Sequence, residues 1–221
     1  QLSIAVTRGR IPVSSVDASY MIDKSTGYIK LNKFTENSYE EFMQAMENLL
    51  KQGMQSLIYD LRGNGGGFMN EAVDMADEFL DGDKLIVYTA GVNNKKKEYR
   101  CKRPGLFEKG KLVLLVDELS ASASEVLAGA LQDWCRATII GRRTFGKGLV
   151  QEQYPLSDGS AIRLTVARYY SPLGRSIQRS YENGKKVYMD ELWERFNSGE
   201  LLSADSIRLH TDGKKFMTSC K

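Results

Sequence analysis

Apolar residues recur along this chain in two alternating spacings. Short apolar runs typical of buried strands lie at 27–31, 56–61, 84–89, 111–117 and 137–140. Helical spacing of apolar residues separates them from Ser38 to Gly53, near Asn70 to Leu80, and directly after Ser122. Ser38 and Glu41 have the spacing of a capping box that opens the first helix. Strands that alternate with helices predict an α/β domain with parallel pairing.

The later part of the chain has a different pattern. The apolar runs 149–154 and 162–170 flank Asp158 and Gly159, which predicts a β-hairpin with its turn at these two residues. A polar tail follows, with one helix expected at 189–196. We therefore divide the chain into an N-terminal arm or edge strands (1–26), a core (27–180) and a C-terminal extension (181–221).

Composition limits the classes of function. The 221 residues, 42% hydrophobic and 27% charged, can bury a core of their own. The net charge of +3 gives no reason to expect a nucleic-acid partner, and we read the basic run Lys95–Lys97 as a polar loop. No stretch has the length of a membrane span, and no signal peptide opens the chain. Because the chain starts at Gln1 rather than Met, we expect a targeting signal to lie upstream.

The cysteines are Cys101, Cys135 and Cys220, an odd number without a CxxC pair. With one histidine in the chain, His210, they form no recognisable metal-binding pattern. The sequence therefore predicts free or partly buried thiols, no metal and no cofactor.

Ser122 lies where a nucleophile works well. It follows a buried strand and opens a helix, so unpaired backbone N–H groups and the helix dipole face a developing oxyanion, and Ala123 supplies one such N–H. The competing interpretation is structural, because Ser122 and Glu125 also have the spacing of a capping box. Ser120 and Ser124 compete for either role.

A glycine run, Gly63 to Gly67 interrupted by Asn64, lies at another strand-to-helix junction. Without side chains, its backbone N–H groups can approach a ligand or an oxyanion closely, although a tight structural turn is an equal alternative. A nucleotide loop is excluded. The run lacks the Gly-Lys-Ser/Thr of a Walker A loop, and Phe68 stands where the Rossmann fingerprint needs a small residue.

A base for Ser122 must come from elsewhere, since His210 lies in the polar tail and lysine is the known substitute for histidine. Lys147 stands between two glycines just before a strand, on the face that also carries Gln151. An exposed lysine in a turn is the alternative. At neutral pH about one ordinary lysine in 2,500 is neutral, so a base role requires a pKa lowered by ~3 units. Burial against Phe145 and Leu149 could provide this shift.

Four motifs occur together in one order: 27–30 (GYIK), 60–67 (DLRGNGGG), 120–125 (SASASE) and 144–151 (TFGKGLVQ). In this order and spacing they closely resemble the carboxyl-terminal processing peptidases, also called tail-specific proteases, of the S41 family. The resemblance covers roughly residues 27 to 180.

The resemblance implies that Ser122 is the nucleophile, Lys147 the general base and Gln151 the residue that orients the lysine amine. It implies an oxyanion hole made by the N–H of Ala123 and one glycine N–H of the run, with Gly66 favoured over Gly65. It also implies an α/β fold similar to crotonases and Clp proteases, a βαβ spiral.

Family members usually carry an upstream PDZ domain, for which this chain has no room, and most are exported to the periplasm, cell envelope or thylakoid lumen. The resemblance therefore implies a periplasmic or envelope location, and protein or peptide substrates with accessible carboxyl termini. It leaves open a homo-oligomer and an association with the membrane envelope through the missing N-terminal segment. Two alternatives are a non-catalytic ligand-binding module of the same fold, as in retinoid-binding repeats, and a crotonase-like acyl-CoA enzyme.

Overall fold

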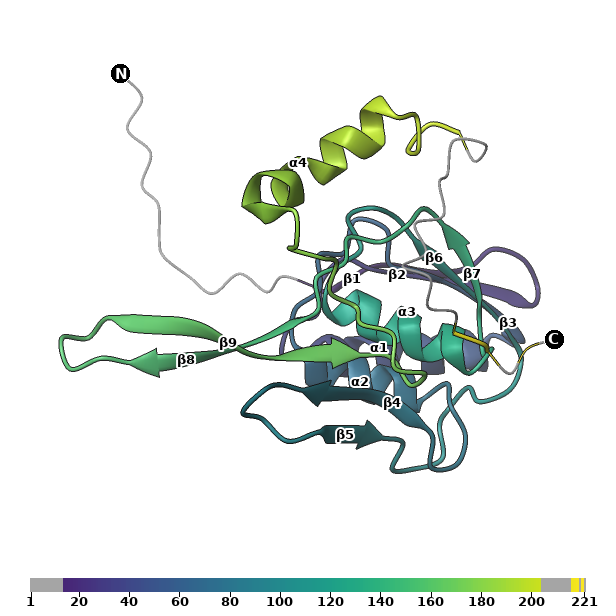
Figure 1. Ribbon diagram of the computed structural model, residues 1–221. Helices are drawn as coiled ribbons and strands as arrows, with labels where there is room; N and C mark the ends of the chain where they lie inside the picture. The colour runs from purple at the N-terminus through teal and green to yellow at the C-terminus, as the bar shows by residue number, and fades with distance from the viewer. Residues whose placement is uncertain (1–13, 204–215, 219, 221) are drawn as a thin grey trace, which may run out of the picture.

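The chain is described by a computed structural model at residues 14–203, 216–218 and 220, where three helices are enclosed between two β-sheets (Figure 1). In chain order the elements are β1 (Val16–Met21), β2 (Thr26–Leu31), α1 (Ser38–Lys51), β3 (Ser56–Asp60), α2 (Met69–Asp77), β4 (Leu85–Ala90), β5 (Lys97–Arg100), β6 (Lys111–Val116), α3 (Ala123–Asp133), β7 (Thr138–Gly141), β8 (Leu149–Pro155), β9 (Ala161–Tyr170) and α4 (Gly184–Asn197). Each predicted strand and helix is present, with ends shifted by a few residues. The predicted α/β class is confirmed.

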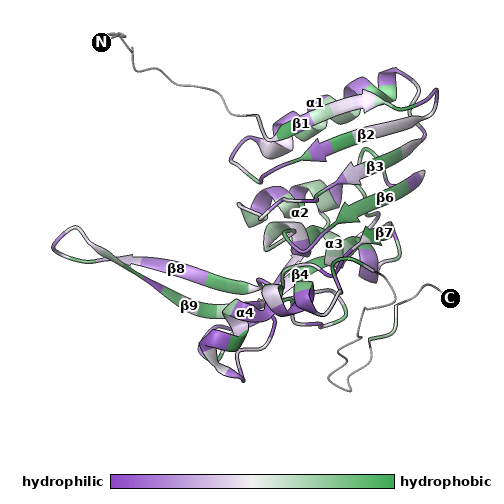
Figure 2. Cartoon of the chain, turned by 90° about the horizontal axis from the view of Figure 1, so that it is seen from above, coloured by the Kyte–Doolittle hydropathy of each residue, from purple (hydrophilic) through white to green (hydrophobic). Residues whose placement is uncertain are grey.

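The first sheet has the strand order β1-β2-β3-β6-β7 (Figure 2). Strand β1 pairs antiparallel with β2, and the remaining neighbours are parallel. The predicted N-terminal arm therefore supplies an edge strand of the core, while residues 1–13 lie outside the described part. The second sheet, in the order β5-β4-β9-β8, is antiparallel throughout. The sequence pattern predicted the parallel pairing but not this separation into two sheets.

Successive side chains of the parallel strands point to opposite faces of the sheet, and the more apolar set faces the helices. In β2, β3 and β6 the fully buried side chains point to α1, α2 and α3 and build the core, with Ile29, Leu31, Leu57, Tyr59 and Leu114 at its centre. The intervening residues, among them Ile58 and Val113, are half-buried on the other face.

Helix α1 packs Phe42, Met46 and Leu49 into the core as predicted, but its predicted capping box is wrong. Ser38 does not cap the helix, because its buried hydroxyl donates to the Lys33 carbonyl and to Ser15 Oγ. Glu41 instead accepts hydrogen bonds from the backbone N–H groups at the start of β1. Both side chains therefore attach the edge strand to the helix.

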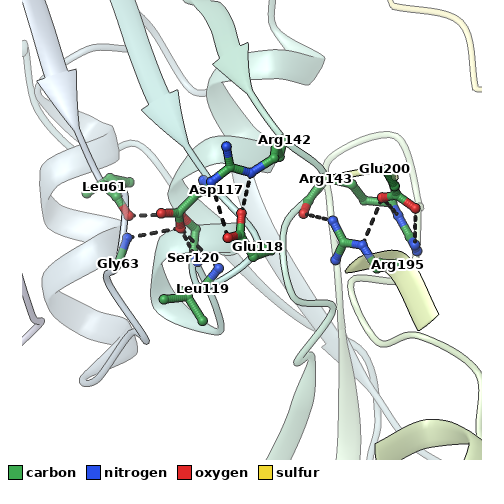
Figure 3. A network of polar contacts seen from close by, with 10 residues as sticks. All are labelled: Leu61, Gly63, Asp117, Glu118, Leu119, Ser120, Arg142, Arg143, Arg195 and Glu200. Atoms are coloured by element: carbon green, nitrogen blue, oxygen red, sulfur yellow. Dashed lines mark hydrogen bonds and ion pairs between the residues drawn. The ribbon is translucent and has the colours of Figure 1, made fainter. Parts of the chain in front are cut away.

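Parallel pairing brings the ends of β3 and β6 to the same edge of the sheet. The loops that follow them are tied together there: the Ala121 N–H donates to the Asn64 carbonyl at 3.0 Å, and the Gly63 N–H donates to Asp117 at 2.9 Å. Figure 3 shows the contacts of Asp117 with Gly63, Leu119 and Ser120. The glycine run and the turn at Ser122 are thereby held side by side.

Strands β8 and β9 form the predicted hairpin, and it projects away from the body of the molecule (Figure 1). Its turn is closed by the Leu156 N–H, which donates to the Ser160 carbonyl at 2.8 Å. The predicted tail helix is confirmed as α4, which starts five residues earlier than expected. His210 lies outside the described residues. No helix among the described residues is long and apolar enough to cross a membrane.

The prediction of free thiols is wrong for two of the three cysteines. Cys135, just after α3, forms a disulfide with Cys220, 85 residues later in the chain, and their Cα atoms are 5.7 Å apart. Cys101 is a buried free thiol. Cysteine spacing could not predict this disulfide. An odd number of cysteines is equally compatible with no disulfide at all, and the two partners are far apart in the sequence.

Breaking this disulfide should destabilise the protein. Closing a loop of this length in the unfolded chain removes conformational entropy, so Cys220→Ser is expected to lower the free energy of unfolding by about 2–4 kcal/mol. Denaturant titration measures this loss, and under reducing conditions the variant and the wild type should become equal. Unfolded, unreduced protein should expose one thiol and reduced protein three. Three thiols without reductant would contradict the pairing.

Candidate active site

The backbone of Ser122 adopts a conformation that is unusual for a residue with a side chain. Its φ of 56° and ψ of −114° make it one of two non-glycine residues with positive φ in the described part of the chain. It stands at the sharp turn between β6 and the first residue of α3. A strained strand-to-helix turn of this kind exposes a nucleophile at the edge of the sheet in α/β-hydrolases.

The three serines of the SASASE motif have different surroundings. Ser120 is fully buried and its hydroxyl donates to the Leu61 carbonyl at 2.8 Å. Ser124 is also fully buried and donates to the Asn64 carbonyl at 2.9 Å. Both hydroxyls attach the glycine-run loop to the base of α3. Ser122 is the member of the three that lines a pocket.

This pocket has a volume of about 320 Å³ and brings together residues from four separate segments. Ser122 contributes from the start of α3, Lys147 from the loop before β8, and Gly65 to Gly67 from the loop after β3. Two residues that the sequence analysis did not single out, Asn32 and Lys33, complete the lining. They follow β2 directly. Because β2, β3 and β6 are parallel, the loops that follow these strands lie at the same edge of the sheet.

The glycine run lies against the turn at Ser122 with no room for a side chain. A Cβ on Gly66, whose φ is +91°, would stand 2.5 Å from the Ala121 oxygen and 2.7 Å from the Ser122 Cβ. The Gly66 N–H donates to Asn64 Oδ1 at 2.9 Å. Within the described residues, no hydrogen bond from the N–H groups of Gly65, Gly67 or Ala123 is seen. Which glycine donates to an oxyanion stays a prediction.

Lys147 and Gln151 differ from what was expected of their surroundings. The Lys147 side chain is exposed, not buried between Phe145 and Leu149, because Phe145 stacks on the guanidinium of Arg179 at 4.3 Å. Gln151 is also exposed, pairs with Thr165 in the hairpin next to a β-bulge, and is not part of the pocket lining. The structure brings Lys147 and Ser122 into one pocket and leaves Gln151 beside it.

Glu125 connects the serine turn to the lysine loop, a role that the capping-box interpretation did not include. One carboxylate oxygen accepts the N–H groups of Ser122 and Lys147, both at 2.8 Å. The other accepts the Thr144 hydroxyl at 2.7 Å and the Gly146 N–H at 2.6 Å. Burial raises the pKa of this carboxyl, and the four hydrogen bonds act in the opposite direction.

A larger cavity of about 570 Å³ lies at the ends of β2, β3, β6 and β7 and is lined by Lys30, Arg62 and Arg142 among others. Its two guanidinium groups already have partners. Arg62 forms a two-pronged contact with the buried carboxylate of Asp60, and Arg142 pairs with Glu118 (Figure 3). None of the described residues that line this cavity is a serine, threonine or cysteine, so the smaller pocket is the candidate active site. No group of metal-ligating side chains occurs in the described part of the chain.

The contact between the glycine run and Ser122 can be tested by Gly66→Ala. The added methyl group would collide with the turn at Ser122, and alanine at position 66 would have to adopt a strained positive φ. We therefore expect a loss of about 3 kcal/mol in the free energy of unfolding. Gly63→Ala is the matched control, because Gly63 also has positive φ (+76°) but open space around its Cβ position. It should cost about 1 kcal/mol. Equal losses, measured by denaturant titration, would contradict the close contact.

Comparison with known proteins finds relatives of this chain. The chain is 40% identical over 177 residues to the "Carboxyl-terminal-processing protease" of Synechocystis, covering 79% of this chain and 41% of that protein. It is 34% identical over 219 residues to the "Carboxy-terminal-processing protease" of Bartonella bacilliformis, covering 97% and 50%. The chain thus spans about half the length of these relatives or less.

A solved structure, the "Photosystem II D1 C-terminal processing protease", superposes with a TM-score of 0.67 at 36% identity, covering 78% of this chain and 47% of that one. The expected architecture, shared with the S41 peptidases, is thereby confirmed. Residues 25–184, most of the chain and close to the predicted core of 27–180, match the description "Peptidase family S41". This chain therefore belongs to peptidase family S41.

Proposed function

We propose that this chain is the catalytic core of a serine endopeptidase in which Ser122 is the nucleophile and Lys147 the general base. The observation that carries the proposal is the position of Ser122. It occupies a strained turn at a helix N-terminus, in one pocket with Lys147 and Gly65 to Gly67. Backbone N–H groups at such a turn stabilise an oxyanion where it forms.

The proposed reaction proceeds in two halves. Neutral Lys147 accepts the Ser122 hydroxyl proton while Oγ bonds to the scissile carbonyl carbon, whose oxygen becomes an oxyanion held by the Ala123 N–H and a glycine N–H. Collapse breaks the C–N bond, and the lysine ammonium returns the proton to the leaving amine. Water, deprotonated by Lys147, then hydrolyses the acyl-enzyme and releases the acid. We assign to Gln151 the orientation of the lysine amine.

We propose protein or peptide substrates that are cut near accessible carboxyl termini, as the names of the relatives say of those proteins. We also propose a periplasmic or cell-envelope location. The Cys135–Cys220 disulfide supports it, since disulfides persist mainly in oxidising compartments outside the cytoplasm.

A digestion assay tests the proposed function. Peptides that share one sequence but end in a free carboxylate or in an amide are incubated with the chain, and the products are identified by mass spectrometry. We expect cleavage near the free carboxyl terminus, and none with Ser122→Ala. Equal cleavage by wild type and Ser122→Ala would overturn the proposal. Turnover of an acyl-CoA thioester in place of a peptide would favour the crotonase-like alternative.

A further inference from the structure

Residues 177–179, which follow β9, lie directly against the loop that carries Lys147. Two consecutive residues hold the glycines on either side of the lysine. The Arg179 N–H donates to the Gly146 carbonyl at 3.1 Å, and Gln178 Oε1 accepts the Gly148 N–H at 2.9 Å. The lysine loop is therefore attached at both of its ends to the same short segment.

The two glycines permit this close approach. A Cβ on Gly148 would stand 2.6 Å from the Gln178 nitrogen and 2.8 Å from the Ile177 Cβ. A Cβ on Gly146 would stand 3.0 Å from the Arg179 Cβ, and its φ is +84°. Glycine is thus needed on both sides of Lys147 by packing against 177–179, and not only by the turn itself.

The side chain of Gln178 is fixed in the orientation that this contact needs. Gln178 is 8% exposed, and its amide nitrogen donates to the Arg179 carbonyl at 3.0 Å. Its amide oxygen is thereby directed at the Gly148 N–H. Because the site is buried, loss of this acceptor would leave the N–H without a partner, which is more costly than loss of an exposed hydrogen bond.

Arg179 joins the lysine loop to α4. Its guanidinium lies between the rings of Phe145, at 4.3 Å, and Tyr188, at 3.9 Å, and pairs with Glu191 of α4 at 2.8 Å. Glu191 also pairs with Arg143 at the start of the lysine loop. Figure 3 shows how Glu200, just beyond α4, joins Arg143 to Arg195, whose Nη2 donates to the Arg143 carbonyl at 2.6 Å. The start of the loop is therefore anchored to α4 directly, and Phe145 is anchored to it through Arg179.

We infer that Gln178 and Arg179 are positioning residues for Lys147: they hold its backbone so that the amine points at Ser122. This inference rests on the proposed function. A loop with two glycines has many accessible conformations, and an exposed lysine side chain adds more. Glu125 restrains the loop from the side of α3, and residues 178–179 restrain it from the side of α4. Neither residue touches the reacting atoms, so their effect must appear in the rate of proton transfer.

The test measures acylation of Ser122 by a serine-directed acylating probe, a β-lactone whose ring opens as Oγ attacks its carbonyl carbon, at increasing probe concentrations. Gln178→Met keeps the size and burial of the side chain but removes the acceptor. We expect its maximal acylation rate to fall about 10- to 100-fold while the half-saturating probe concentration stays the same. Gln178→Glu restores an acceptor oxygen and should recover part of the rate. Gln132→Met, at an exposed position of α3, is the matched control and should behave as wild type.

Arg179→Lys keeps the positive charge but removes the planar group between the two rings, and it should also lower the maximal rate. It gives a second test if Gln178→Met does not fold, which thermal unfolding will reveal. Amide exchange at Gly148 should accelerate in Gln178→Met and not in Gln132→Met.

Ser122→Ala and Lys147→Ala are measured in parallel to separate the two claims. If both abolish acylation but Gln178→Met and Arg179→Lys keep the wild-type maximal rate, the positioning role is overturned and the proposed function stands. If Lys147→Ala is acylated as fast as wild type, or wild type is not acylated at all, the proposed function fails and the positioning role fails with it.

Discussion

Lys147→Ala is expected to slow acylation of Ser122 by about 10²- to 10⁴-fold, the range that a general base contributes. The variant should fold normally, because the Lys147 side chain is exposed and the contact with Glu125 uses its backbone N–H. The measurement is the rate of covalent modification by the same acylating probe, followed by intact-mass spectrometry. Only an exposed side chain is shortened, so the binding of the probe should change little.

The pocket contains a second exposed lysine, Lys33, which makes a matched comparison. Lys33→Ala removes the same kind of side chain from the same pocket but not the proposed base. We expect it to lose less than about tenfold in rate. Added small amines should partly restore Lys147→Ala and should not affect Lys33→Ala. A larger loss in Lys33→Ala than in Lys147→Ala would mean that the base has been assigned to the wrong lysine.

Glu125→Gln is expected to reduce acylation by at least about 100-fold although the two side chains have nearly the same shape. The carboxylate accepts four hydrogen bonds, two on each oxygen. A glutamine has one acceptor oxygen, and its NH₂ group would face two donors. Leaving buried donors unpaired costs about 1–3 kcal/mol each, and here the donors include the N–H groups of Ser122 and Lys147.

This loss should be visible in the structure of the loop as well as in the rate. Amide exchange at Gly146 and Lys147 should accelerate in Glu125→Gln, with a lower midpoint of thermal unfolding. Glu118→Gln is a suitable control, since Glu118 is also partly buried and paired, with Arg142, but lies outside the pocket. If Glu125→Gln kept the wild-type rate, Glu125 would be a helix cap and nothing more.

The sequence pattern was sufficient for local structure. The strand at 111–116 and the helix after Ser122 could be predicted because each element shows its own periodicity. The departure of β4 and β5 into a second sheet could not, since β4 pairs with β9, some 80 positions later, and β5 pairs with β4. Pairing at such separation leaves no trace in a local window.

The candidate site was predicted only in part, because some of its contacts also join residues that are distant in sequence. The motifs and their resemblance to a known family led to Ser122 and Lys147, and the two residues lie in one pocket. Glu125 was visible only as the last residue of a capping box, because its contacts with Gly146 and Lys147 cross 21 and 22 residues. Gln178 lies in a stretch without periodicity. A buried polar side chain that satisfies a distant backbone group is recognised from coordinates, not from spacing.

Two predicted side-chain contacts are wrong because the side chains contact other residues instead. Phe145 was expected to bury Lys147, but its ring stacks on Arg179 instead. Ser38 was expected to cap α1, but its hydroxyl joins the buried polar group that holds β1. In both cases the local pattern was compatible with the predicted contact, and a residue distant in sequence offered a more favourable one.

The most direct test of the central claim is to locate the covalent adduct. Protein treated with the acylating probe is digested, and the peptide that contains Ser120, Ser122 and Ser124 is sequenced by tandem mass spectrometry in wild type and in Lys147→Ala. We predict the adduct on Ser122 alone in wild type, and its near absence in Lys147→Ala at the same reaction time. An adduct on Ser120 or Ser124, or equal labelling of Ser122 in both proteins, would contradict a Ser122–Lys147 mechanism.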